Sequence, residues 1–185
     1  MPVTVRPTRA DKETARFFAR RSTPAAEKIA QGITWGADEH FLCTAAAVWW
    51  LYARGRSAWE RNASTHVLIT TVTAAVLPHL MKHLFTQERP DRLSVEAHVH
   101  GAPFSGSPLQ AFPSGHAVHV GALVSAACEL PPTQRAGAWT LGALLVFTRI
   151  FLLAHWASDV AAGLAVGAAA ERIIRPLTGY GRRSA

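Results

Sequence analysis

Apolar stretches much longer than a typical β-strand alternate with short polar segments over most of this chain. The longest, residues 62–81, contains no Asp, Glu, Lys or Arg. A helix of about 20 apolar residues crosses a hydrocarbon core of about 30 Å. Four further apolar stretches lie at residues 41–53, 116–130, 136–154 and 159–174. The pattern therefore predicts an all-α, integral membrane helical bundle of about five apolar helices.

Polar and helix-breaking segments separate these stretches. Arg54-Gly-Arg56 follows the first one, and Pro131-Pro132 lies between the third and the fourth. A loop rich in Pro, Gly and Ser runs from about residue 86 to residue 113. Such residues end helices or form turns. The last apolar stretch is rich in Ala and Gly, which permit close helix packing in lipid.

The first 40 residues have a different character, because charged and apolar positions are mixed. Their apolar residues recur partly at helical spacing, which is typical of an amphipathic helix at a membrane surface. A partly ordered tail is an equal alternative for residues 1–10. No apolar signal-peptide core follows Met1, so insertion is expected to use internal segments. We expect an interfacial segment at 1–40, a membrane-embedded domain at 41–176 and a basic tail at 177–185.

Composition favours a membrane protein over a soluble one. The 185 residues fit one domain, and 49% of them are hydrophobic while only 17% are charged. The mean hydropathy of +0.12 is lower than a bundle of long spans would give, so a soluble helical bundle is the alternative. The two cysteines, Cys43 and Cys128, are too few for a disulfide framework or a zinc site.

The net charge of +7 fits nucleic acid, anionic lipid or an anionic substrate. Threading the five stretches places Lys82, His116 and His155 on one face and most other arginines on the opposite face. Because positive charge is retained in the cytoplasm, the first face is expected to be extracytoplasmic. The basic residues of 1–40 conflict with this topology unless they lie on the membrane surface or segment 41–53 does not fully cross.

Two cations follow the longest apolar stretch. Lys82 and Arg89 are separated by six residues, and Pro90 makes a turn plausible. A compact ammonium and a planar guanidinium together suit the oxygens of a phosphate. A basic edge beside the membrane is the alternative for this segment taken alone.

The sequence Pro113-Ser114-Gly115-His116 opens the third apolar stretch. Ser114 or Gly115 is expected near the N-cap of a helix, where free backbone N–H groups bind anions. His116 in the first turn is placed to donate a proton to a leaving oxygen. A plain helix cap also explains the serine and the glycine.

Arg149, His155 and Asp159 lie in and after the fourth stretch. On a continuous helix His155 and Asp159 would share a face within hydrogen-bond reach, so the carboxylate would fix the imidazole tautomer and make His155 a candidate nucleophile. Arg149 lies six residues earlier and needs a bend to reach the same phosphate. The alternative is an Arg149–Asp159 ion pair beside a packed histidine, since charges in apolar surroundings are paired or functional.

Taken together, K-x6-R-P, P-S-G-H and R-x5-H-x3-D in this order resemble the type 2 phosphatidic acid phosphatase family. That family also includes polyprenyl-diphosphate phosphatases, glucose-6-phosphatase and the vanadium haloperoxidases. The resemblance implies an acid phosphatase/haloperoxidase-like helical core and a metal-independent histidine phosphatase. It implies that His155 attacks phosphorus to give a phosphohistidine, Asp159 orients it and His116 protonates the leaving group. The phosphate-binding residues that it implies are Lys82, Arg89, Ser114, Gly115 and Arg149.

The expected function is hydrolysis of a lipid phosphate or diphosphate in a bacterial-type membrane. Polyprenyl carriers rank first, either a polyprenyl diphosphate or the decaprenyl-phosphoryl-ribose phosphate of cell-wall assembly, ahead of phosphatidic acid and phosphatidylglycerol phosphate. A vanadate-dependent haloperoxidase and a non-enzymatic membrane scaffold are further alternatives. No cofactor, metal or nucleic acid is expected, and His98 and His100 lack the partners of a metal site. The oligomeric state stays open.

Overall fold

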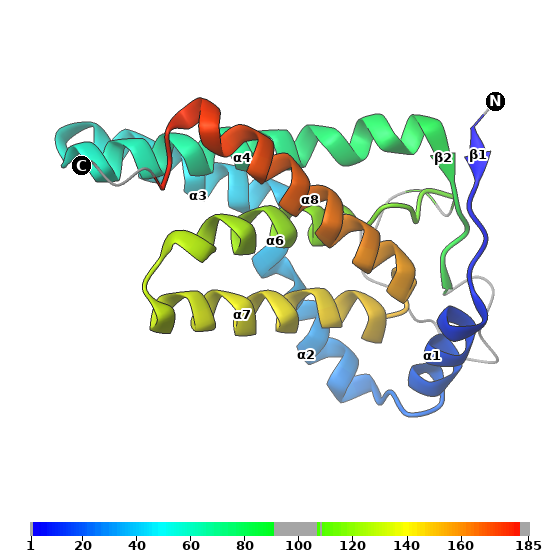
Figure 1. Cartoon of the computed structure of the whole chain (residues 1–185). Coiled ribbons are helices and arrows are strands. Elements are labelled where there is room, and N and C mark those ends of the chain that lie inside the picture. The colour runs from blue at the N-terminus through cyan, green and yellow to red at the C-terminus, as the bar shows by residue number, and fades with distance from the viewer. Residues whose placement is uncertain (1, 91–106, 108, 182–185) are drawn as a thin grey trace.

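The computed structural model describes residues 2–90, 107 and 109–181. Each predicted apolar stretch coincides with a helix, which confirms the all-α prediction (Figure 1). Pro131 precedes the fourth of these helices, as expected for a helix break between the third and fourth stretches. The helices are α1 (Arg9–Ala19), α2 (Pro24–Thr34), α3 (Glu39–Tyr52), α4 (Ala58–Leu84), α6 (Gly115–Ala126), α7 (Pro132–Phe151) and α8 (Ala157–Thr178), with short 3-10 helices η1 (Trp35–Ala37), η2 (Ala53–Gly55) and η3 (Ala127–Glu129).

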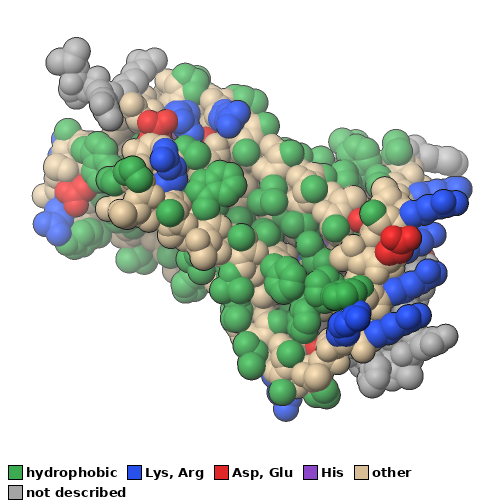
Figure 2. Space-filling view, turned by 60° about the horizontal axis from the view of Figure 1, so that its bottom comes forward, with side chains coloured by type: hydrophobic (Ala, Val, Ile, Leu, Met, Phe, Trp, Pro, Cys, Tyr) green, Lys and Arg blue, Asp and Glu red, His purple; other side chains and the backbone are tan. Residues whose placement is uncertain are grey.

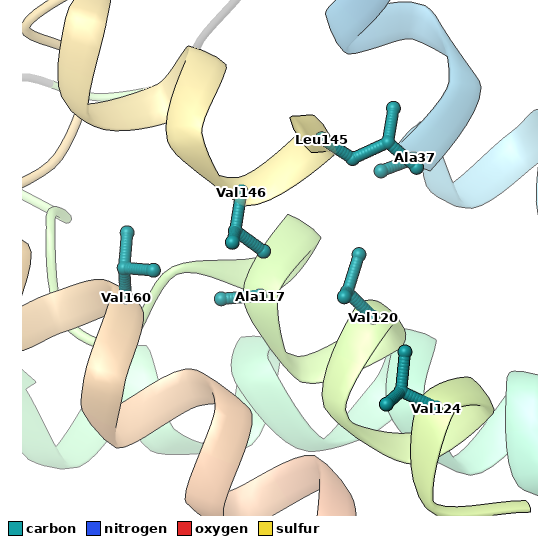
Figure 3. Packing of buried hydrophobic residues seen from close by; sticks show 7 residues of the cluster. All are labelled: Ala37, Ala117, Val120, Val124, Leu145, Val146 and Val160. Carbon is teal, nitrogen blue, oxygen red and sulfur yellow. The ribbon is translucent and has the colours of Figure 1, made fainter. Parts of the chain in front are cut away.

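Helix α6 lies at the centre of the bundle and packs closely against α8. A Cβ on Gly121 would lie 2.7 Å from the Cα of Leu164, and a Cβ on Gly167 would lie 2.8 Å from the backbone nitrogen of Ala122. Both positions therefore require glycine, which is the close packing predicted from the small residues of the last stretch. Figure 3 shows the hydrophobic core beside this contact, where α6, α7 and α8 meet: Ala37, Ala117, Val120, Val124, Leu145, Val146 and Val160.

A buried polar network joins α4, α6 and α8 near the C-terminal end of α8. The carboxylate of Glu171 lies 3.0 Å from Nε2 of His66, accepts a hydrogen bond of 2.6 Å from Ser125 and two of 2.8 Å from Arg175. The side chains of His66 and Glu171 are fully buried. Because every group of this network has a partner, it stabilises the end of the bundle opposite to β2 and α1 (Figure 1).

The N-terminal segment is ordered and lies at the other end of the bundle. Strand β1 (Val3–Thr4) pairs in parallel with β2 (Phe85–Thr86), which directly follows α4. Asp11 of α1 accepts hydrogen bonds of 2.9 and 2.8 Å from the backbone and hydroxyl of Ser158. The alternative of a partly ordered tail for residues 1–10 is therefore wrong over the described residues 2–10. Figure 2 shows Lys and Arg side chains gathered at this end of the molecule, beside a broad hydrophobic surface.

The outer surface of the bundle carries many apolar side chains, as expected for contact with lipid. Within the described ranges, α4 is the one helix that is long and apolar enough to cross a membrane by length and composition. The helices of the other predicted stretches have 14, 12, 20 and 22 residues. Exposed examples are Phe41, Val48 and Leu51 on α3, Val76 and Leu80 on α4, Trp139 and Leu141 on α7, and Ile173 and Leu177 on α8.

Candidate active site

A cavity of about 380 Å³ lies at the end of the bundle that carries β2 and α1. It brings together six of the eight predicted site residues, which come from all three sequence motifs. The other two, Ser114 and Asp159, are fully buried and do not line it. The six lining residues are Lys82, Arg89, Gly115, His116, Arg149 and His155.

The chain reverses its direction directly after α7, and this explains how Arg149 reaches the same cavity as His155. Leu153 adopts a left-handed conformation with φ of 54°, which is uncommon for a residue other than glycine. The carbonyl oxygen of Arg149 accepts hydrogen bonds from the backbone nitrogens of Ala154 (3.1 Å) and His155 (3.2 Å). The chain therefore folds back on the end of α7, and this is the bend that the six-residue spacing required.

The ring of His155 is oriented by a backbone carbonyl. Its Nδ1 donates a hydrogen bond of 2.7 Å to the carbonyl oxygen of Ala111, which leaves Nε2 as the nitrogen with a free electron pair. His155 precedes α8 instead of lying on it, and its Nδ1 is 3.7 Å from Oδ2 of Asp159. That oxygen instead accepts 2.9 Å from the backbone nitrogen of Trp156. The prediction of a direct hydrogen bond between Asp159 and His155 is therefore wrong, although the carboxylate lies next to the ring.

The surroundings of His155 favour the neutral imidazole that a nucleophile requires. The side chain is 4% exposed, and burial holds its pKa well below the ordinary value. The guanidinium groups of Arg89 and Arg149 lower this pKa further. A neutral histidine beside fixed cations can attack an anionic phosphorus compound, whereas a protonated one cannot.

Two buried guanidinium groups form the cationic side of the cavity. Arg89 donates hydrogen bonds to the carbonyl oxygens of Ala154 (2.8 Å) and Ser107 (3.2 Å), so it is held in place by backbone. Arg149 donates 3.1 Å to the hydroxyl of Thr34 at the end of α2. Among the described residues no Arg149–Asp159 ion pair is formed, and Nε of Arg149 has no hydrogen-bond partner. Donors that backbone and hydroxyl groups hold in place suit a bound anion.

The start of α6 adds backbone donors to these cations. Ser114 is the N-cap residue, as predicted, and its hydroxyl makes no hydrogen bond to the described part of the chain. A Cβ on Gly115 would lie 3.8 Å from Pro78, which is ordinary contact, so packing alone does not require glycine there. Free N–H groups at this helix start, beside Lys82, complete a site for an oxyanion.

Several residues of the site carried no clear signal in the sequence. Thr34 and the Ala111 carbonyl act only through tertiary contacts, whereas His119 lies three residues after His116 on the same helical face and was detectable. Trp156, the residue after His155, is 1% exposed, and its indole nitrogen donates a hydrogen bond of 2.8 Å to the carbonyl oxygen of Glu88. His98 and His100 lie outside the described residues, and the described part of the chain has no cluster of three or more metal-ligating side chains.

The fold and the cavity define a class of protein: a helical bundle with a cavity that is lined by buried arginines and a buried histidine and that suits an oxyanion. The sequence matches the profile of the PAP2 superfamily over residues 63–183. Since this match covers more than half of the chain, the protein belongs to the PAP2 superfamily. The resemblance inferred from the three motifs is thereby confirmed.

Two curated relatives carry the name lipid A 1-phosphatase. The protein from Rhizobium johnstonii is 38% identical over 104 residues, which is 56% of this chain and 43% of that protein. The protein from Rhizobium etli is 36% identical over 103 residues, which is 55% of this chain and 44% of that protein. The matched region spans less than half of the length of either relative.

Two solved structures share the fold. The transmembrane PAP2-type phosphatidylglycerolphosphate phosphatase from Bacillus subtilis superposes with a TM-score of 0.71 at 17% identity, covering 95% of this chain and 88% of that one. Aquifex aeolicus LpxE superposes with a TM-score of 0.65 at 17% identity, covering 89% and 93%. At this identity the likeness shows the fold, and both neighbours confirm the predicted architecture of an all-α membrane-type bundle.

Proposed function

We propose that this protein is an integral membrane phosphatase that removes the phosphate group from a lipid by way of a phosphohistidine. The observation that carries the proposal is the placement of a buried, neutral His155 in one cavity with Lys82, Arg89 and Arg149. A binding protein for phosphate would need the cations but gains nothing from a neutral histidine whose Nδ1 is fixed by a carbonyl group.

In the proposed reaction the cations and the start of α6 hold the phosphate while Nε2 of His155 attacks phosphorus. A nitrogen–phosphorus bond forms, the ester bond to the leaving oxygen breaks, and His116, which takes up a proton when the phosphate anion binds beside it, gives that oxygen a proton. His116, now neutral, takes a proton from water, whose oxygen attacks the phosphohistidine and releases inorganic phosphate. His155 and His116 return to their starting states, so the proton balance closes.

Asp159 supports this cycle electrostatically in our proposal. Its carboxylate lies 3.7 Å from Nδ1 of His155 and stabilises the positive charge that the ring gains when phosphorus is bound. Ala111 holds the tautomer and Asp159 supplies the charge, so the two functions that sequence reasoning assigned to one residue are divided between two groups.

We place the cavity on the extracytoplasmic face of the membrane. The other end of the bundle carries Arg54, Arg56 and Arg61, in agreement with retention of positive charge in the cytoplasm. The basic residues of α1 lie at the cavity end because α1 docks on Ser158. They fit a helix on the membrane surface facing anionic lipid, which is one of the two solutions expected from the sequence.

The identity of the lipid substrate is narrowed by two observations. The sequence ranks polyprenyl carriers first, and the names of the two Rhizobium relatives favour lipid A. Both are phosphate esters joined to a buried tail, which suits a cationic cavity at one end of an apolar bundle. Phosphatidic acid and phosphatidylglycerol phosphate share this chemistry and belong in the same substrate panel.

The test is phosphate release in detergent from such a panel, with a metal chelator present throughout. Wild type is expected to hydrolyse at least one lipid phosphate, and His155→Ala is expected to lose at least a thousandfold in kcat. His83→Ala, which removes an exposed imidazole outside the cavity, serves as the matched control. Equal rates for wild type and His155→Ala would show that the cavity is not the active site. Vanadate should inhibit because it mimics five-coordinate phosphorus.

A further inference from the structure

His119 of α6 is a buried histidine that the reaction above does not use. It is 2% exposed, and neither of its ring nitrogens has a hydrogen-bond partner among the described residues. A buried polar group without a hydrogen bond costs about 1–3 kcal/mol, and buried side chains are therefore normally paired. An unpaired imidazole at this position points to a ligand that completes its hydrogen bonding.

The position of His119 places it beside the leaving group of a substrate bound in the cavity. It lines the same cavity as His116 and His155. On α6 it follows His116 by three residues, which places it about 4.5 Å further along the helix axis, away from the start of α6 where the phosphate is bound. A substrate with its leaving oxygen at His116 therefore presents its next atoms to His119.

An apolar groove of about 160 Å³ lies next to this cavity. Ala37 lines both spaces, and Val120, the residue after His119, lines the groove together with Leu123 and Leu145. His119 thus stands where the polar cavity meets an apolar space between α3, α6 and α7. A lipid phosphate bound in this direction would have its tail in the groove and its headgroup carbons beside the imidazole.

We propose that His119 is a specificity-determining residue that hydrogen-bonds an oxygen on the carbon next to the phosphate-bearing carbon of the substrate. The inference rests on the proposed phosphatase function and narrows its substrate class. Lipids built on a phosphorylated glycerol or a phosphorylated sugar have such an oxygen. Prenyl monophosphates have carbon at that place, so they would leave the imidazole unpaired.

The chemistry of imidazole suits this task. A neutral ring offers one N–H donor and one acceptor nitrogen, so it can pair with a hydroxyl group in either direction or donate to an ester oxygen. Loss of one such hydrogen bond of about 1–1.5 kcal/mol corresponds to roughly a fivefold to tenfold change in binding. His119 is expected to discriminate by this factor between lipids that have an oxygen on that carbon and lipids that do not.

The test compares two phosphate esters of equal chain length in mixed micelles: 1-acyl-glycerol 3-phosphate and a simple alkyl phosphate. Wild type should prefer the glycerol compound about tenfold in kcat/KM, by one hydrogen bond. His119→Leu should reduce this ratio to near one. His119→Gln keeps a donor and an acceptor and should retain most of the preference, and His83→Leu, outside the cavity, should retain all of it.

Three results would overturn the inference while leaving the phosphatase function intact. These are equal efficiency of wild type on both esters, an unchanged preference in His119→Leu, and a loss of both rates by the same factor in His119→Leu. His119→Leu is also expected to fold at least as stably as wild type, because it removes an unpaired polar group. Loss of folding would mean that the imidazole holds the core together, and would contradict the inference as well. Absence of phosphate release from either ester and from the wider panel would instead refute the phosphatase function.

Discussion

Replacing Asp11 by Ala should detach α1 from the active-site end of the bundle. Asp11 is 3% exposed and accepts two hydrogen bonds from Ser158 and two from Thr8. Hydrogen bonds to a charged group contribute about 1.5–3 kcal/mol each, and the capping contacts add about 1 kcal/mol. From the two Ser158 bonds and the cap we expect a loss of about 4–7 kcal/mol, which corresponds to a fall in Tm of roughly 8–28 °C for a chain of this size.

The assay is thermal unfolding in detergent, with Glu13→Ala as the matched control. Glu13 is an exposed carboxylate on the same helix, so its removal should change the free energy of unfolding by less than about 0.5 kcal/mol. Hydrogen exchange at the start of α8 should also increase in Asp11→Ala, because Ser158 loses its acceptor. A fall in Tm no larger than that of the control would refute the docking of α1 through Asp11.

The same contact predicts the pH dependence of docking. Burial acts to raise the pKa of Asp11, but the hydrogen bonds from Ser158 and Thr8 together outweigh it and lower the pKa below the ordinary 3.8. A lowered carboxyl pKa stabilises the folded state fully above the ordinary value, and this stabilisation is lost as the pH falls through the lower folded value. The difference in Tm between wild type and Asp11→Ala should therefore be constant near neutral pH and shrink below about pH 4.

Three further substitutions test other parts of the structure. Gly167→Ala should lower the free energy of unfolding by about 1–3 kcal/mol, because its methyl group meets the backbone of α6. Gly137→Ala is the control, with open space around its Cβ, and should be neutral or slightly stabilising. Equal effects would refute the close α6–α8 packing. Glu171→Gln should cost about 1–3 kcal/mol, because an amide cannot replace the buried carboxylate between His66, Ser125 and Arg175, although Arg175 keeps its ion pair with Glu129. The kcat of the folded fraction should stay at the wild-type value, because the network lies at the far end of the bundle. Arg149→Lys should lower kcat/KM at least a hundredfold with a Tm within a few degrees of wild type, since an ammonium cannot reproduce a guanidinium fork; a loss below tenfold would remove Arg149 from the phosphate site.

The helices were predictable because they depend on local sequence. The meeting of the three motifs was predictable because consecutive helices run in alternating directions. Uninterrupted apolar runs such as 62–81 form helices, and Pro131-Pro132 can only separate two of them. Once five helices cross alternately, Lys82, His116 and His155 must lie at the same end. The resemblance to a known family rested on the same residues and is confirmed by the match over residues 63–183.

The details of the site were not predictable, because they depend on contacts between distant segments. The Ala111 carbonyl that orients His155 and the Thr34 hydroxyl that holds Arg149 leave no periodic pattern in the sequence. A four-residue spacing made Asp159 the apparent partner of His155, whereas the turn at Leu153 places His155 before the helix. Docking of Asp11 on Ser158 joins residues that are 147 positions apart.

The central claim is that His155 becomes covalently phosphorylated. The direct measurement is rapid quenching of the enzyme with a radiolabelled lipid phosphate, followed by peptide mapping of the bound label and tests of its stability in acid and in base. Label that is lost in acid, survives base and maps to the peptide containing His155 is the predicted result, and His155→Ala should carry none. Label on another residue, or phosphate release by wild type with no trapped label and unchanged turnover in His155→Ala, would contradict the account.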